Sequence, residues 1–260
     1  MQKIVLVIVV LALLPFNVFS ADAGKRGYEI AKEADDRDVG WKDSTAQVVM
    51  TLRNKRGDES VRENRMRSLE VPGDGDKSII IFDSPADVKG TAFLSHTHAK
   101  KSDDQWLFLP ALKRIKRISS SNKSGPFMGS EFAYEDISSQ ELEKYSYKYL
   151  KDEVVNGKDT FVIERIPEYK KSGYSKQLVW IDKEIYQPLK VEFYDRKKTL
   201  LKTLTYHDYK QYVNKYWRSL RMEMNNHQTG KSTTLAWKSY EFQTGLSDRD
   251  FDKNALKRMR

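Results

Sequence analysis

The stretch from Trp106 to Asp136 reads WLFLPALKRIKRISSSNKSGPFMGSEFAYED and combines features that rarely occur together. It opens with the apolar run Trp106–Leu109 and returns as a segment, 113–118, whose isoleucines are separated by lysines and arginines. This pattern predicts a strand with one apolar and one cationic face. The polar loop that follows carries Phe127 and Met128 near its tip, which is typical of a lid or an insertion loop.

Two strings within this stretch, WLFLPALKRIKRISSS and FMGSEFAYED, resemble the signature of the outer membrane lipoprotein-sorting family, whose periplasmic members are related in fold to LolA. The resemblance implies a strongly curved antiparallel sheet, an unclosed barrel whose concave face is covered by helices. It also implies a lipid or lipoprotein acyl group as cargo. Because the likeness is to the wider family and not to LolA itself, it does not identify that cargo. Members of the family are found with RND-type exporters, which implies an inner-membrane partner of that kind.

The first residues are typical of a secretory signal peptide. One cation precedes an apolar run, Ile4–Leu14, that is too short for a permanent membrane span, and small residues follow it. Cleavage after Ser20 or after Ala23 satisfies the small-residue rule, so residues 1–20 are expected to form the signal peptide. Residues 21–260 then form one periplasmic domain. The chain has no cysteine, which excludes a disulfide and an acylated lipobox.

Composition favours β structure around an aromatic interior, since 39% of the residues are hydrophobic and 12% are aromatic. The net charge of +9 and the pI near 9.3 indicate anionic partners. For an exported protein these are phospholipid or lipopolysaccharide head groups, or the charge is simply that of a solvated surface. No nucleic-acid-binding or phosphate-cradling motif is present in the sequence.

Hydrophobic periodicity predicts one helix and then a long meander of strands. Residues Gly24–Asp38 have helical spacing, with Tyr28, Ile30, Ala31 and Ala34 on one face. After residue 40 the period changes to two, and turn residues separate roughly ten to twelve short strands. Ser247 and Asp250 have the spacing of a capping box, which predicts a short C-terminal helix over Phe251, Leu256 and Met259.

A curled sheet of this length encloses an interior too wide for side chains to fill, and a ligand would occupy the remainder. The period-two pattern predicts that large apolar residues of one sheet face line this lipid-binding cavity: Met50, Trp106, Phe108, Trp180, Phe193, Met222, Met224 and Trp237. The same face continues through Val48, Leu178, Val191, Leu204, Leu220 and Leu235. Methionine and tryptophan side chains adapt to varied acyl chains, although each of these residues also fits an ordinary core.

The cationic strand and the loop beyond it predict a mouth for this cavity. Arg114 and Arg117 are expected to hold an anionic head group, while Phe127 and Met128 cover the acyl chains as a lid. An alternative is that the cations form a solvated strand face.

Catalytic signals are weak. His96 and His98 have the spacing of the first two ligands of a metallo-β-lactamase motif, but Lys100 stands where that motif has an aspartate. An ammonium group at that position repels a metal ion, so we expect no metal site. Without cysteine or a serine nucleophile elbow, we expect neither a cofactor nor an enzyme.

The sequence therefore favours a monomeric periplasmic carrier that binds a lipid or a lipoprotein acyl group and moves it between membranes through transient membrane contact. One alternative is a lipid-sensing regulator of an inner-membrane partner, which would need a second domain or a protein-binding surface. A hydrolase is a further alternative, supported only by the histidine pair.

Overall fold

The computed structural model describes residues 16–119 and 121–258, and these residues contain one α-helix and thirteen strands. The helix is α1 (Phe16–Arg37). The strands are β1 (Asp43–Arg53), β2 (Glu59–Leu69), β3 (Lys77–Ser84), β4 (Ala92–His96), β5 (Asp104–Leu109), β6 (Arg114–Ile118), β7 (Tyr145–Val155), β8 (Lys158–Pro167), β9 (Tyr174–Asp182), β10 (Pro188–Asp195), β11 (Leu200–Tyr212), β12 (Tyr216–Asn226) and β13 (Ser232–Phe242). Short 3-10 helices are η1 (Pro110–Leu112), η2 (Phe127–Gly129), η3 (Leu142–Lys144), η4 (Asp248–Phe251) and η5 (Lys253–Lys257).

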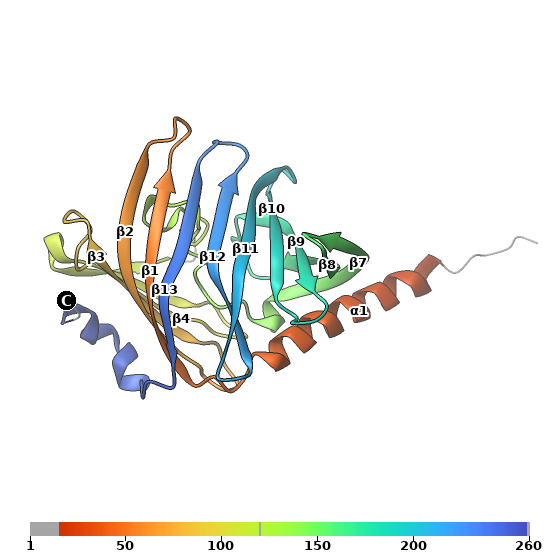
Figure 1. Cartoon of the computed structure of the whole chain (residues 1–260), viewed down its shortest axis with the longest axis horizontal. Helices are drawn as coiled ribbons and strands as arrows, with labels where there is room; N and C mark the ends of the chain where they lie inside the picture. Colours follow the sequence, from red (N-terminus) through yellow and green to blue (C-terminus); the bar gives the residue numbers. More distant parts are fainter. Residues whose placement is uncertain (1–15, 120, 259–260) are drawn as a thin grey trace, which may run out of the picture.

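All described strands form a single antiparallel sheet in the order β6-β5-β4-β3-β2-β1-β13-β12-β11-β10-β9-β8-β7. Two meanders meet where β1 pairs with β13, and β6 and β7 are left as the two edges. Figure 1 shows the sheet curling around an interior without closing. The expected mainly-β, unclosed barrel is thus confirmed, with thirteen strands instead of ten to twelve.

Alternating burial explains why these segments form half-buried strands. In β1, Ala46, Val48 and Met50 are buried while Gln47 between them is exposed. Met50 lies opposite Leu235 of β13, and both belong to the main apolar core on the concave face. Period-two patterning therefore fixes the register, because a slip by one residue would expose this entire set.

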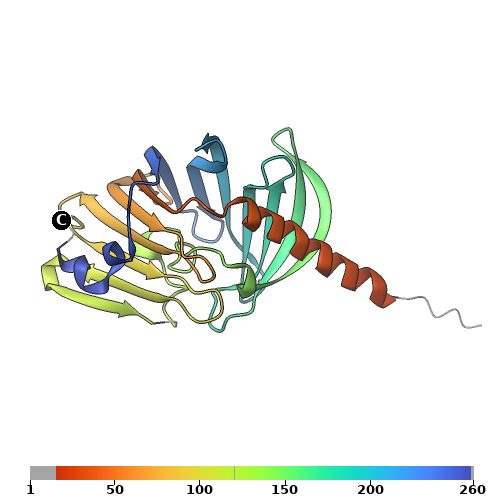
Figure 2. The same ribbon diagram turned by 90° about the horizontal axis from the view of Figure 1, so that it is seen from below.

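Helix α1 crosses one end of the half-barrel and packs against β7 (Figure 2). It begins at Phe16, earlier than the expected Gly24, and its Ile30 is buried in the main core as predicted. Tyr28 is exposed instead of buried. Most of the expected signal peptide lies in residues 1–15, outside the described residues. No helix in the described part of the chain has both the length and the apolar character needed to cross a membrane.

The rest of the concave face is covered by segment 121–144, which contains 3-10 turns, whereas the resemblance implied helices over this face. Phe127 and Phe132 of this segment are buried in the main core with residues of β1, β3 and β13. The cover of the concave face therefore consists of one helix and one irregular segment.

A second, smaller apolar core lies on the convex face. Ile79, Leu94 and Phe108 of the sheet pack there with Phe251 and Leu256 from the C-terminal turns η4 and η5. The predicted capping box is present, since the Asp250 carboxylate accepts hydrogen bonds from the Ser247 backbone N–H and hydroxyl. The C-terminal segment forms two 3-10 turns in place of the expected helix, and Met259 lies outside the described residues.

Candidate functional site: a cavity beneath helix α1

A cavity of about 640 Å³ opens between α1 and the half of the sheet that contains β7–β11. Its volume falls within the range of known small-molecule sites. Its walls come from α1, the α1–β1 connection, the β2–β3 turn, the loop after β4, segment 139–143 and strands β7–β11.

The floor of the cavity is apolar. Ile163, Val179, Ile181 and Val191 line it, and all four are buried side chains of the main core. They come from β8, β9 and β10, where alternate residues point inward. Opposite this floor, the apolar side chains that α1 contributes to the lining are the small Ala31 and Ala34, and the helix also contributes Asp35. Space therefore remains between helix and sheet, lined by the hydrocarbon surface that an acyl chain requires.

The mouth of the cavity is acidic, although the chain as a whole is basic. Its lining includes seven carboxylates: Asp35, Asp38, Glu70, Asp74, Asp76, Glu141 and Glu143. Some of these carboxylates already interact with other groups of the protein. Asp38 forms an ion pair with Arg218 at 2.6 Å, and Glu70 accepts hydrogen bonds from the Gly40 and Lys42 backbone N–H groups. The lining also contains the cations Lys100 and Arg165.

Asp76 is the most strongly perturbed of these carboxylates. Burial first, and then the charge of Glu141, raise its pKa from 3.8 to about 7, while one hydrogen bond from the Val71 backbone N–H opposes this shift. Burial likewise raises the pKa of Glu141. The mouth therefore loses part of its negative charge as the pH falls towards neutrality and below.

Arg165 of β8 brings a positive charge to the inner wall. Its Nε donates a hydrogen bond of 2.5 Å to Gln177 Oε1, and its guanidinium lies 4.9 Å from the Tyr145 ring centroid. Among the described residues it forms no ion pair with a carboxylate. The lining of the cavity thus combines a guanidinium group and three tyrosines, Tyr147, Tyr186 and Tyr206, with the apolar floor.

None of the eight residues predicted to line the cavity does so. Met50, Phe193 and Met224 lie on the concave face as expected, where they are buried in the main core. Met222 and Trp237 are partly buried against that core. Ligand contact by these five residues stays a prediction. Val191, from the continuation of the same predicted face, is on the cavity floor.

The predicted orientation of Trp106, Phe108 and Trp180 is wrong. Trp106 and Phe108 belong to the convex core, whereas the intervening Leu107 points inward. Trp180 is outside the main core, and Lys190 Nζ lies 3.6 Å from its ring centroid. A period of two shows which residues share a face but does not show which face is concave.

The structure also contradicts the prediction that Phe127 and Met128 form a lid. Phe127 is fully buried, with its ring centroid 5.1 Å from that of Phe93 and 5.4 Å from that of Tyr134. Met128 packs against the same core, and its carbonyl accepts a hydrogen bond from Arg62. These residues hold the irregular segment inside the half-barrel and do not cover a mouth.

The cationic strand does not have the predicted arrangement either. Ile115 packs against the convex core and Ile118 is buried in the concave core, so the two isoleucines lie on opposite faces of β6. Arg114 and Arg117 are exposed residues of this edge strand, and Arg117 pairs with Asp104. Neither arginine lines the cavity, because β6 and the cavity belong to different parts of the sheet.

His96 and His98 make separate contacts. His96 Nε2 hydrogen-bonds the Phe251 carbonyl at 2.9 Å and its ring packs edge-on against Trp106, while His98 Nδ1 is 2.7 Å from Asp74. Within the described residues no group of three or more metal-ligating side chains converges.

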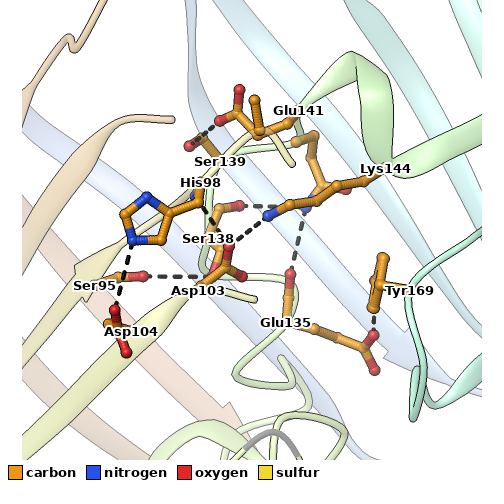
Figure 3. Close-up of polar contacts among 12 residues, drawn as sticks. Ser95, His98, Asp103, Asp104, Glu135, Ser138, Ser139, Glu141, Lys144 and Tyr169 are labelled. Carbon is orange, nitrogen blue, oxygen red and sulfur yellow. Dashed lines mark hydrogen bonds and ion pairs between the residues drawn. The ribbon is translucent and has the colours of Figure 1, made fainter. Parts of the chain in front are cut away.

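A buried polar cluster beneath segment 121–144 was not predicted (Figure 3). Asp103 accepts hydrogen bonds from Lys144 at 2.5 Å and Lys123 at 3.0 Å. Glu135 accepts from the Tyr169 hydroxyl at 2.9 Å and from the Gly173 backbone N–H at 2.8 Å. Its only signal in the sequence was the acidic end of the quoted stretch, and its partners are distant in the chain. These contacts hold the segment against the β4–β5 and β8–β9 loops.

Similarity to solved structures agrees with this architecture. An outer membrane lipoprotein-sorting protein domain from Vibrio parahaemolyticus is 62% identical, with 90% of this chain and 99% of that chain covered and a TM-score of 0.89. A DUF1329 family protein from Desulfovibrio piger is 32% identical over 90% of this chain and 99% of that chain, with a TM-score of 0.85. A LolA superfamily protein from Nitrosomonas europaea is 23% identical over 88% of this chain and 98% of that chain, with a TM-score of 0.70. This last likeness concerns the fold.

A family model described as an uncharacterized protein matches residues 74–258. No protein with a curated description matches the chain. The half-barrel with its covered concave face has the LolA-like fold. On the extent of identity and coverage, the chain belongs to the outer membrane lipoprotein-sorting family.

Proposed function

We propose that this protein is a periplasmic carrier that binds the acyl part of a lipid or lipoprotein in the cavity beneath α1 and moves it between membranes. The observation that carries the proposal is the cavity of about 640 Å³ with an apolar floor on β8–β10. The family membership supports the same function, because the 62% identical relative is described as a lipoprotein-sorting domain, and the acyl chains of a lipoprotein must be kept out of water.

Burial of one acyl chain provides enough free energy for this function. At roughly 0.8 kcal/mol for each methylene group, a chain of about fourteen methylenes gains on the order of 10 kcal/mol when it leaves water. This holds the cargo in solution, and transfer follows when a partner offers an equivalent apolar site. The acidic mouth favours a cargo whose exposed end is uncharged or cationic.

Three further parts of the proposal rest on the sequence and the family. Export depends on the signal peptide expected in residues 1–20, an RND-type exporter is the inner-membrane partner implied by the resemblance, and the protein transports without catalysing a reaction. The histidine contacts described above favour a structural role for His96 and His98 over hydrolysis.

A cavity-filling substitution tests the proposal. Ala34→Phe places a large side chain between α1 and the sheet, whereas Glu29→Phe places the same side chain on an exposed position of the same helix outside the cavity. We expect Ala34→Phe to weaken binding of a fluorescent monoacylglycerol at least tenfold. The thermal midpoint should stay near that of the wild type, and Glu29→Phe should bind normally.

Unchanged binding in Ala34→Phe, with the fold intact by circular dichroism, would place the ligand elsewhere and contradict the proposal. Equal losses in both variants would also contradict it, because the effect would then come from the helix surface and not from the cavity.

A further inference from the structure

The hairpin between β5 and β6 exposes a large apolar side chain at its tip. Leu112, at the end of η1, is 64% exposed, and η1 buries none of its residues. Lys113 follows in the left-handed conformation with a φ of 48°, which makes the turn tight and leaves Leu112 projecting. Isolated exposed leucines are common, so the tip is informative only together with its surroundings.

Those surroundings are strongly cationic. Lys113, Arg114 and Lys116 are exposed, and among the described residues none of them has an ion-pair partner. Arg117 pairs with Asp104, and the stretch from residue 109 to 118 contains no acidic residue. The edge strand therefore presents a concentrated positive charge beside the exposed leucine.

A second cationic segment lies next to this hairpin. The turn η5 packs against β4 and β5, with Leu256 buried against Phe108 in the convex core. Its Lys253 and Lys257, and Arg258 after it, are exposed and form no ion pair within the described residues. Figure 2 shows this C-terminal segment beside the strands at the end of the molecule opposite α1. Chain segments far apart in sequence thus contribute six unpaired cations to one end of the protein.

We propose that the β5–β6 hairpin and η5 form a docking surface for a bilayer rich in anionic phospholipids. Each lysine or arginine near such a surface is attracted to the anionic head groups, and the leucine side chain can enter the interfacial layer. Cations on an edge strand also prevent strand-to-strand aggregation. That role accounts for β6 but not for the exposed Leu112 or for the cations of η5.

The position of this surface makes it independent of the cavity. The β5–β6 turn lies at the same end of the strands as the β3–β4 turn, since Ala92 pairs with Phe108 and Leu109 with Arg114. The mouth of the cavity includes the loop after β4, at the other end of these strands. A protein docked through the hairpin therefore keeps its mouth free for a second partner, and cargo binding does not compete with membrane binding.

Vesicle flotation with the full chain tests the inference, using vesicles of phosphatidylglycerol with phosphatidylcholine and vesicles of phosphatidylcholine alone. We expect preferential binding to the anionic vesicles that weakens at high salt. A variant combining Lys113→Gln, Arg114→Gln and Lys116→Gln should bind anionic vesicles about a hundredfold more weakly, and Leu112→Ser about tenfold more weakly.

The β7–β8 hairpin provides a matched control, because its Val154 is 63% exposed while the neighbouring charges, Lys151 with Glu153 and Lys158 with Asp182, are paired. Val154→Ser should bind vesicles like the wild type. Equal binding of the triple variant and the wild type would overturn the inference, as would equal wild-type binding to both kinds of vesicle. Capture of an acidic protein by the hairpin, without vesicle binding, would assign the surface to a protein partner and would equally overturn it. The cavity variant Ala34→Phe should bind vesicles normally, which separates this outcome from the fate of the carrier proposal.

Discussion

The two halves of the concave face are covered in different ways. Over β1–β3 and β11–β13 the irregular segment 121–144 inserts Phe127, whose ring contacts those of Phe82, Phe93 and Tyr134. The buried ion pair between Lys202 and Asp136, at 2.6 Å, holds the same segment against β11. Over β8–β10 the cover is α1, which contributes Ala31 and Ala34 to the lining of the cavity.

This difference shows how one curved sheet provides both a packed core and a binding site. A cover with large aromatic residues fills the interior to the density of a protein core. A cover with alanines spans the same kind of surface and leaves volume unfilled. The size of the side chains on the cover, and not the shape of the sheet, therefore decides which half holds a ligand.

The largest expected effect comes from emptying the packed half. Phe127→Ala removes a fully buried ring and should lower the free energy of unfolding by about 3–5 kcal/mol, measured by urea denaturation. Ligand binding in the cavity should persist while the variant is folded. Leu112→Ser, at an exposed position, should change stability by less than about 0.5 kcal/mol.

If Phe127→Ala kept its stability but lost its ligand, the irregular segment would be a lid after all. The ligand would then bind in the half of the sheet covered by segment 121–144, and not in the cavity beneath α1.

Much of this fold could be predicted from the sequence, because strands of the sheet follow local rules. Alternation in β1 and turn chemistry between later strands placed the meander, and the quoted stretch indicated the family. Ile30 was predicted on the buried face of a helix, and it is there.

The candidate site could not be predicted in the same way. Its floor combines Ile163, Val179 and Val191 from three strands with alanines of α1, and only tertiary packing brings them together. Trp106 and Phe108 do share one face of β5, as the alternation predicted. That face is the convex one and not the concave one, because the C-terminal turns bury the convex side at that point. A phenylalanine in a polar loop, such as Phe127, was assigned to an exposed loop tip because the sequence does not show which residues pack around it.

A substitution at the mouth of the cavity tests the open half through the pH dependence of stability. The pKa of Asp76 is raised to about 7 when folded, compared with 3.8 for an isolated aspartate, so the folded state binds a proton that the unfolded state releases. The stability linked to Asp76 is therefore complete below pH 4 and declines as the pH rises towards 7. Asp76→Asn should remove this decline. Above pH 8 the free energy of unfolding of the variant should exceed that of the wild type by up to about 4 kcal/mol, and near pH 4 the two values should be equal.

Asp74 provides a control of opposite sign. Its hydrogen bond with His98 lowers its pKa to about 2, so its contribution is present above pH 4 and is lost at lower pH. Asp74→Asn should therefore destabilise the protein at neutral pH. A stability difference between Asp76→Asn and the wild type that stayed constant from pH 4 to pH 8 would show that Asp76 is not buried among carboxylates at the mouth.

The smallest expected effect tests how α1 is held over the open half. A Cβ atom on Gly27 would lie 2.5 Å from the Tyr149 backbone nitrogen, so Gly27→Ala forces the helix away from β7. Gly24→Ala, one turn earlier on the same helix, would have its nearest contact at 3.7 Å from the Tyr147 carbonyl oxygen. Both substitutions improve helix propensity by up to about 1 kcal/mol, and only the first creates a clash. Gly27→Ala should lower the free energy of unfolding by about 1–2 kcal/mol, with faster amide exchange in α1 and β7 than in β1–β3. Gly24→Ala should be neutral or slightly stabilising. Because the cavity exists only while α1 spans it, the Gly27 variant should also release its ligand faster. Uniform amide exchange across the sheet of this variant would show that the two halves do not open separately.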